Sequence, residues 1–227
     1  MPPKFKAMSV HLLTASGVVC ALFALRSAIV LQFEQSFLWL GLALFIDGID
    51  GFFARRYDVK TVLPHVSGEV LDLCVDYVTY VFVPVLMLLL ADKLHGAWGL
   101  GLAALICVTS LYHFSDTNSK TDDNCFVGFP AVWNIVAFYI FALAPPEWVT
   151  SALVLICCGL TFVPWKWIHP LRVTELRGVT LAATALWAAA TAAILFVGFP
   201  AGGATGAAIV LVALYGAGLS LHFGRAR

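Results

Sequence analysis

Long apolar runs alternate with short polar or proline-containing stretches along the 227-residue chain. Helix breakers such as Pro64, Pro145, Pro146, Pro164 and Pro200 fall between the runs. The runs lack the alternation of polar and apolar residues that a membrane barrel requires. Because each backbone amide inside a bilayer needs a partner within its own segment, the pattern predicts eight helices. They are expected at residues 9–30, 37–54, 68–90, 96–114, 129–144, 148–162, 179–196 and 204–223.

The composition indicates what surrounds these helices. Apolar residues make up 61% of the chain and charged residues only 11%, whereas a soluble domain averages roughly 25% charged residues. The net charge is zero, so nothing points to a nucleic-acid partner. The six cysteines show no paired metal-ligand spacing and are expected to be buried thiols. We predict an all-α, multi-pass helical bundle whose partner is the lipid bilayer.

The basic residues predict the orientation of the bundle. With the N-terminus in the cytoplasm, eleven of the thirteen Lys and Arg residues face the cytoplasm, Lys93 faces outside, and Arg26 lies within the first span. This is the positive-inside bias of membrane proteins, and an odd number of spans would remove it. Both termini and the working surface are therefore expected on the cytoplasmic side. The eleven residues are Lys4, Lys6, Arg55, Arg56, Lys60, Lys120, Lys166, Arg172, Arg177, Arg225 and Arg227.

Four aspartates lie where a carboxylate is costly, in or at the ends of apolar segments. Asp47 and Asp50 are three residues apart near the end of the second segment, and Asp72 and Asp76 are four apart near the start of the third. Each spacing places a pair on one helix face. A short loop joins the two helices, so the four carboxylates are expected to converge. Two divalent cations, Mg²⁺ or Mn²⁺, would relieve their repulsion and could clamp a pyrophosphate.

The residues around the aspartates resemble the signature of the CDP-alcohol phosphotransferases, D-x-x-D-G-x-x-A-R followed by G-x-x-x-D-x-x-x-D. All eight fixed positions match. The resemblance implies a helical membrane core, usually dimeric, that uses a CDP-linked donor and two divalent metals and releases CMP. It implies Asp47, Asp50 and Asp72 as metal ligands, and Asp76 as both a metal contact and the base that deprotonates the acceptor. The implied CDP contacts are Asp50, Gly51, Ala54, Arg55 and Gly68.

Two departures from the family pattern point to one branch. The spacer between Arg55 and Gly68 has twelve residues, longer than is usual, and two apolar segments follow the usual core. Both features resemble the bacterial branch that condenses CDP-diacylglycerol with choline. We therefore expect residues 1–178 to form the core of about six spans, residues 179–227 to add two helices, and the chain to be a homodimer in the bacterial inner membrane. A third departure is His11, which stands where the family often has Asn.

Choline is a quaternary ammonium ion, which proteins commonly bind against aromatic faces with a carboxylate nearby. Aromatic and polar side chains at the expected cytoplasmic level are candidates for this pocket, although each of them also suits an interfacial belt. Arginines are scarce around these loops, which mildly favours choline over serine. The candidates are Glu69, Tyr77, Tyr80, Tyr112, His113, Trp133 and Asn134.

Two alternatives remain open from the sequence. A related enzyme could use serine, glycerol or inositol as the acceptor. A transporter or channel lined by carboxylates would also retain intramembrane aspartates, but it would carry them at several depths along a pathway. Here all four lie near one expected membrane face, beside a glycine and arginine set that transport does not require.

Overall fold

The structure is a computed structural model, and it describes residues 2–117, 125–167 and 176–225. Within these ranges the chain is almost entirely helical, so the predicted all-α class is confirmed. Of the basic residues used to predict the orientation, Lys120, Arg172 and Arg227 lie outside the described residues. The elements are α1 (Pro3–Ile29), α2 (Phe33–Arg56), α3 (Val59–Val62), α4 (Gly68–Asp76), η1 (Tyr77–Phe82), α5 (Val83–Leu90), α6 (Gly96–Ser115), β1 (Phe126–Val127), α7 (Trp133–Leu143), α8 (Glu147–Leu160), β2 (Lys166–Trp167), α9 (Arg177–Val197) and α10 (Gly203–Arg225).

Each of the eight apolar segments forms a helix, but the helices differ in length. Six are long and apolar enough to cross a membrane: Pro3–Ile29, Phe33–Arg56, Gly68–Leu90, Gly96–Ser115, Arg177–Val197 and Gly203–His222. The fifth and sixth segments form the shorter apolar helices α7 and α8. Large apolar side chains cover the outside of the bundle, as lipid-facing helices require. The chain is therefore a multi-pass membrane protein, and its described residues form six full-length candidate spans and two shorter apolar helices.

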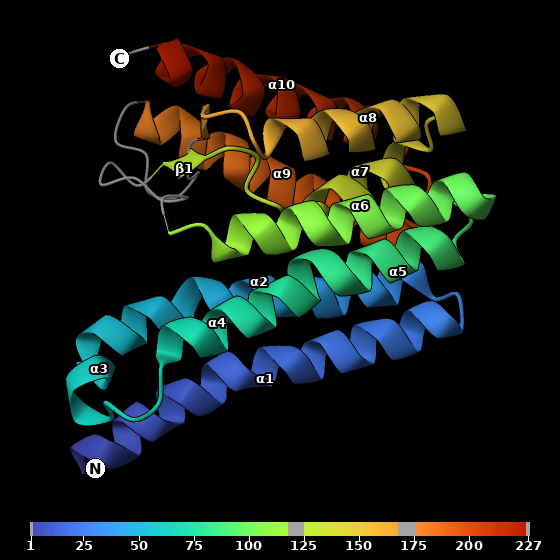
Figure 1. The fold of residues 1–227 in the computed structure, drawn as a ribbon. Coiled ribbons are helices and arrows are strands. Elements are labelled where there is room, and N and C mark those ends of the chain that lie inside the picture. Colours follow the sequence, from blue (N-terminus) through green and yellow to red (C-terminus); the bar gives the residue numbers. More distant parts are fainter. Residues whose placement is uncertain (1, 118–124, 168–175, 226–227) are drawn as a thin grey trace.

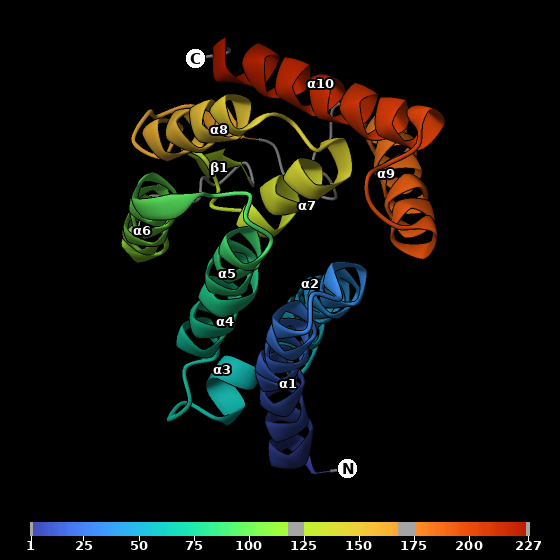
Figure 2. The same cartoon turned by 90° about the vertical axis from the view of Figure 1, so that its right-hand side faces the viewer.

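The long helices run side by side between the two ends of the bundle (Figure 1). α1 begins and α10 ends at the same end, where α3 and β1 also lie. Seen end-on in Figure 2, α1, α2 and α4 form one group, and α10 lies at the opposite side of the molecule. α9 lies beside α10 and also contacts α2. At the end that carries α3, strands β1 and β2 pair antiparallel, with Phe126 opposite Trp167. This small sheet was not predicted, because its two strands are two residues long and far apart in sequence.

Close contact between α1 and its neighbours α2 and α4 fixes the geometry of the first group. The Ser36 hydroxyl of α2 donates a hydrogen bond to the Ala24 carbonyl of α1 at 2.9 Å. Nearer the end that carries α3, Gly17 of α1 faces Val75 of α4, and a Cβ atom at Gly17 would lie 2.6 Å from Val75 Cγ1. Small residues allow such close helix approach in membranes. The missing side chain at position 17 is thus a condition for the α1–α4 packing.

The third span changes its helical form along its length. It begins at Ser67, whose hydroxyl accepts a hydrogen bond from the Val70 amide at 3.2 Å and so caps α4. Directly after Asp76 the helix widens into the π-helical segment η1, and it returns to α-helix at Val83. Such π-helical segments are rare and frequently lie at functional sites.

The C-terminal hairpin α9–α10 is attached to the rest of the bundle by hydrogen bonds and aromatic contacts. Glu34 Oε1 of α2 accepts a hydrogen bond from the Phe199 amide at 3.1 Å. The Phe199 ring packs in an aromatic cluster with Phe37, Phe138 and Phe141. Tyr139 of α7 donates to the Ile209 carbonyl of α10 at 2.9 Å. These contacts make the hairpin part of the bundle. The division of the chain into a core of residues 1–178 and an added pair of helices at 179–227 stays a prediction.

Replacing Gly17 by Ala should destabilise the bundle, because the new Cβ would overlap Val75 Cγ1 at 2.6 Å. Overpacking of this kind costs about 1–3 kcal/mol, so we expect a lower thermal unfolding midpoint in detergent. Gly41→Ala is the matched control, since nothing lies within 4 Å of a Cβ at Gly41. Equal midpoints for the two variants would contradict the proposed tight α1–α4 contact.

Candidate active site

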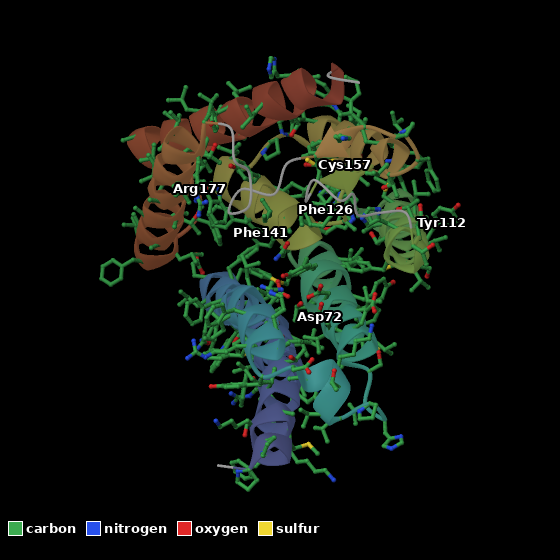
Figure 3. All side chains as sticks on the ribbon, turned by 90° about the vertical axis from the view of Figure 1, so that its left-hand side faces the viewer. Asp72, Tyr112, Phe126, Phe141, Cys157 and Arg177 are labelled. Atoms are coloured by element: carbon green, nitrogen blue, oxygen red, sulfur yellow. The ribbon has the colours of Figure 1, made fainter. Side chains whose placement is uncertain are left out.

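Three of the four predicted aspartates converge in the structure. Asp47 and Asp50 of α2 and Asp72 of α4 each offer one oxygen atom, and these atoms all lie within 4.8 Å of one another. Asp50 is 6% exposed, and the other two are half-buried. The two helices meet here because the loop through α3 returns the chain antiparallel and α1 packs against both. Figure 3 shows Asp72 in the region between the first helices of the bundle.

The fourth aspartate, Asp76, lines the same small cavity as the other three. It lies on α4 one helical turn beyond Asp72, on the same face. The remaining walls come from α1, α2, α4 and η1, with two hydroxyl side chains among otherwise apolar or small residues. The lining residues other than the aspartates are Thr14, Gly17, Ala43, Ile46, Val75 and Thr79.

Two hydroxyl groups lie beside the carboxylates. The Tyr80 hydroxyl of η1 donates a hydrogen bond to Asp47 Oδ2 at 2.6 Å. The Thr14 hydroxyl of α1 donates to the Val10 carbonyl at 3.3 Å, and Thr14 lines the cavity together with Asp50. An ionised carboxylate accepts hydrogen bonds readily, and hydrogen bonds to charged groups are shorter and stronger than neutral ones. Asp47 is thereby held by a neighbouring helical segment.

The electrostatics of this cluster favour a bound cation. Two unit charges 4.8 Å apart repel by roughly 3.5 kcal/mol at an effective dielectric constant of 20. Carboxylate oxygens at these separations are the ligands that hard divalent cations prefer. The donor set therefore fits a divalent metal ion, and it offers only oxygen atoms.

Of the residues that the signature assigns to CDP, only Asp50 lines the cavity of the aspartates. Arg55 is exposed, and its guanidinium Nη1 would lie 3.4 Å from a Cβ at Gly51, so the side chain folds over that glycine. Gly68 lies against His11 of α1, whose Cε1 would be 3.1 Å from a Cβ at Gly68. Ala54 instead packs against a small apolar cluster of α1 and α3.

The candidate choline-binding residues do not all lie near the aspartates. Tyr80 reaches the aspartates, whereas the Tyr77 hydroxyl donates to the Cys107 carbonyl of α6 at 3.1 Å. His113, Trp133 and Asn134 are buried between α6 and α7, and Trp133 Nε1 donates to Ser110 Oγ at 2.8 Å.

Two further candidates are exposed. Tyr112 lies at the outside of α6 (Figure 3), with its ring tilted against that of Phe162. Glu69 lies exposed in the first turn of α4. The structure thus does not gather the seven residues into one pocket, and their binding role stays a prediction.

Comparison with known proteins places this cluster in a family. The sequence profile of the CDP-alcohol phosphatidyltransferases matches residues 9–165, which include all four aspartates. The chain belongs to this family. The matched region ends before α9, so the C-terminal hairpin lies outside the part that defines CDP-alcohol phosphatidyltransferases.

Several curated relatives within the family carry the name phosphatidylcholine synthase. The protein of Mesorhizobium japonicum is 48% identical over 191 residues, which cover 82% of this chain and 70% of the relative. That of Pseudomonas aeruginosa is 45% identical and covers 81% of this chain and 77% of its own length. That of Bradyrhizobium diazoefficiens is 45% identical over 92% of this chain and 78% of its own.

Sequence reasoning missed several residues that shape the site. Gly17 and Thr14 of α1 line the cavity, and their spacing of three places them on one helix face. That spacing could have indicated that the two residues line a common surface. A single sequence does not show, however, which face of α1 packs against α2 and α4. The contact between Tyr80 and Asp47 was also missed, because it joins residues 33 positions apart on different helices.

Replacing Asp50 by Asn should separate the electrostatic role of the cluster from its packing. Asn has almost the same shape but removes one negative charge, so the repulsion falls and the metal-free thermal midpoint should stay equal or rise. The increase in midpoint that Mn²⁺ gives the wild-type protein should be lost. Thermal unfolding in detergent, with EDTA and with Mn²⁺, measures both effects.

Glu34→Gln is the control for a carboxylate outside the cluster. It weakens the bond that Glu34 accepts from the Phe199 amide, so the metal-free midpoint should fall while stabilisation by Mn²⁺ is retained. Undiminished Mn²⁺ stabilisation of Asp50→Asn would show that the aspartate cluster does not bind the metal.

Proposed function

We propose that this chain makes phosphatidylcholine by transferring the phosphatidyl group of CDP-diacylglycerol to choline, with release of CMP. The observation that carries the proposal is the convergence of the signature aspartates around one cavity. The choice of choline as acceptor draws on the relatives named phosphatidylcholine synthase, which align over most of this chain. The longer spacer between Arg55 and Gly68 supports the same branch of the family.

Asp47, Asp50, Asp72 and Asp76 are the residues that would hold two divalent cations, Mg²⁺ or Mn²⁺. Oxygen atoms of the first three lie within 4.8 Å of one another, and Asp76 lines the same cavity. When bound, such cations neutralise a diphosphate and stabilise the charge that develops on the attacking and leaving oxygens.

The donor's nucleotide is assigned to Asp50, Gly51, Ala54, Arg55 and Gly68 by the family signature. Gly51 follows Asp50 directly, and the exposed Arg55 guanidinium lies over Gly51, one helical turn beyond Asp50. A guanidinium in this place suits a diphosphate, since it can donate two parallel hydrogen bonds. The acyl chains of the donor would extend into the lipid beside the helices.

Asp76 is proposed as the base of the reaction. It accepts the proton of the choline hydroxyl, and the choline oxygen forms a new bond to the phosphorus of the phosphatidyl group. The bond between that phosphorus and the bridging diphosphate oxygen breaks, so the electron pair leaves with CMP. The products are phosphatidylcholine, CMP and one proton, and no covalent intermediate with the protein is required.

The proposed location is the bacterial inner membrane, with both termini and the active site on the cytoplasmic side. This assignment is supported by the basic residues of the described chain. Residues of α1, α2, α3, β2 and α9 carry most of them at the end where α1 begins, whereas Arg26 in the last turn of α1 and Lys93 after α5 lie toward the other end. A homodimer is proposed from the family resemblance alone.

A reaction with purified protein, CDP-diacylglycerol, Mn²⁺ and a panel of alcohols tests the activity. We expect CMP and phosphatidylcholine with choline, and little CMP with serine, glycerol or inositol. A different preferred alcohol would move the chain to another branch of the family. Absence of CMP with every alcohol would overturn the proposal and favour a carboxylate-lined transporter.

Replacing Asp76 by Asn tests the proposed base. A positioned base typically contributes 10²- to 10⁴-fold, so turnover with choline should fall by at least about 100-fold. Stabilisation of the protein by Mn²⁺ should largely remain, because Asp47, Asp50 and Asp72 are intact. Near-normal turnover of Asp76→Asn would exclude Asp76 as the base.

A further inference from the structure

Tyr80 occupies an unusual place in the third span. Its side chain is 8% exposed and belongs to the main hydrophobic core. Its hydroxyl nevertheless ends on Asp47 Oδ2 at 2.6 Å, so the ring spans the distance from the core to the aspartate cluster. A buried tyrosine hydroxyl needs a partner, and here the partner is a carboxylate of the cluster itself.

The π-helical segment explains how Tyr80 reaches this position. Asp72, Asp76 and Tyr80 follow one another at intervals of four residues. In a regular α-helix four residues turn by about 400°, so each interval moves the side chain about 40° around the axis. The wider turn of η1 reverses part of this rotation, because its hydrogen bonds join residues five apart. Tyr80 therefore stays on the side of the helix that carries Asp72.

We propose that Tyr80 is a positioning residue that orients Asp47 as a metal ligand, a role that rests on the metal-dependent function proposed above. Its hydroxyl occupies Oδ2 and thereby fixes the rotation of the carboxylate about its last bond. A carboxylate fixed in this way keeps one oxygen within 4.8 Å of oxygens of Asp50 and Asp72. Groups that hold a ligand in this way commonly set the affinity of a metal site.

The same geometry argues against Tyr80 as a wall of a choline cage. A cage binds a quaternary ammonium ion against the open face of an aromatic ring. The ring of Tyr80 is enclosed in the core, and only its hydroxyl end meets the cluster. The two roles make different predictions. Removing the hydroxyl would leave the aromatic face of a cage intact, but it would remove the hydrogen bond that orients Asp47.

Tyr80→Phe removes the hydroxyl and keeps the ring. Loss of a group that orients a ligand typically lowers metal affinity about 10- to 100-fold, and we expect a loss in that range for Mn²⁺. Binding is measured on purified protein in detergent from the electron paramagnetic resonance signal of free Mn²⁺. The KM for choline, measured at saturating Mn²⁺, should not change.

Tyr139→Phe is the matched control. It also removes a buried tyrosine hydroxyl bonded across helices, but that hydroxyl donates to the Ile209 carbonyl, away from the aspartates. Its Mn²⁺ affinity should equal that of the wild-type protein. Thermal midpoints in EDTA show whether each variant is folded.

A double variant makes the test specific to the contact. In the Asp47→Ala background the hydroxyl of Tyr80 has lost its partner, so Tyr80→Phe should lower the thermal midpoint in EDTA by less than it does in the wild-type background. An equal fall in both backgrounds would show that the hydroxyl acts on folding without its bond to Asp47, and would overturn the proposal.

The remaining outcomes separate this proposal from the function it rests on. Wild-type Mn²⁺ affinity in Tyr80→Phe would overturn the positioning role while leaving the proposed function intact. A raised KM for choline with unchanged Mn²⁺ affinity would assign Tyr80 to the acceptor pocket instead. Failure of the wild-type protein to bind Mn²⁺ in a way that Asp50→Ala abolishes would overturn the metal site itself.

Discussion

Mutual repulsion among acidic side chains is the constraint around which this bundle is built. Asp47, Asp50 and Asp72 bring oxygen atoms within 4.8 Å of one another in a largely apolar chain. Such an arrangement is stable only if the surrounding helices hold it against the repulsion. α1 provides much of that support, since it packs against both α2 and α4 and contributes Thr14 and Gly17 to the wall of the cavity. The fold thus stores an unfavourable interaction at one site, as sites for charged ligands commonly do.

The helices and the aspartate cluster were predictable from sequence because local rules determine them. Backbone hydrogen bonding in lipid forces an apolar run to be helical, and all eight runs are. Spacings of three and four residues place Asp47 with Asp50 and Asp72 with Asp76 on single faces. The short loop between the helices then brings the two pairs together. Each of these steps uses residues close in sequence.

The features that sequence did not predict depend on contacts between distant residues. The pairing of β1 with β2 joins residues about 40 positions apart. The widening of the third span at η1 comes just before Pro84, which has no N–H to donate to the Tyr80 carbonyl, but a proline by itself does not determine that a helix widens. The seven acceptor-pocket candidates were chosen only because they share an expected depth in the membrane. A shared depth does not determine whether a side chain points out of the bundle or into its core. Tyr112 accordingly lies on the outside, and Trp133 lies in the core.

The C-terminal hairpin shows a further property of the bundle. Its last helix, α10, is held to the preceding part of the chain by main-chain acceptors, because Tyr139 donates to the Ile209 carbonyl and Trp165 donates to the Ser220 carbonyl. A carbonyl oxygen is present whatever side chain its residue carries. Substitutions in α10 can therefore accumulate over evolution without loss of these two anchors, as long as the helix keeps its length and register.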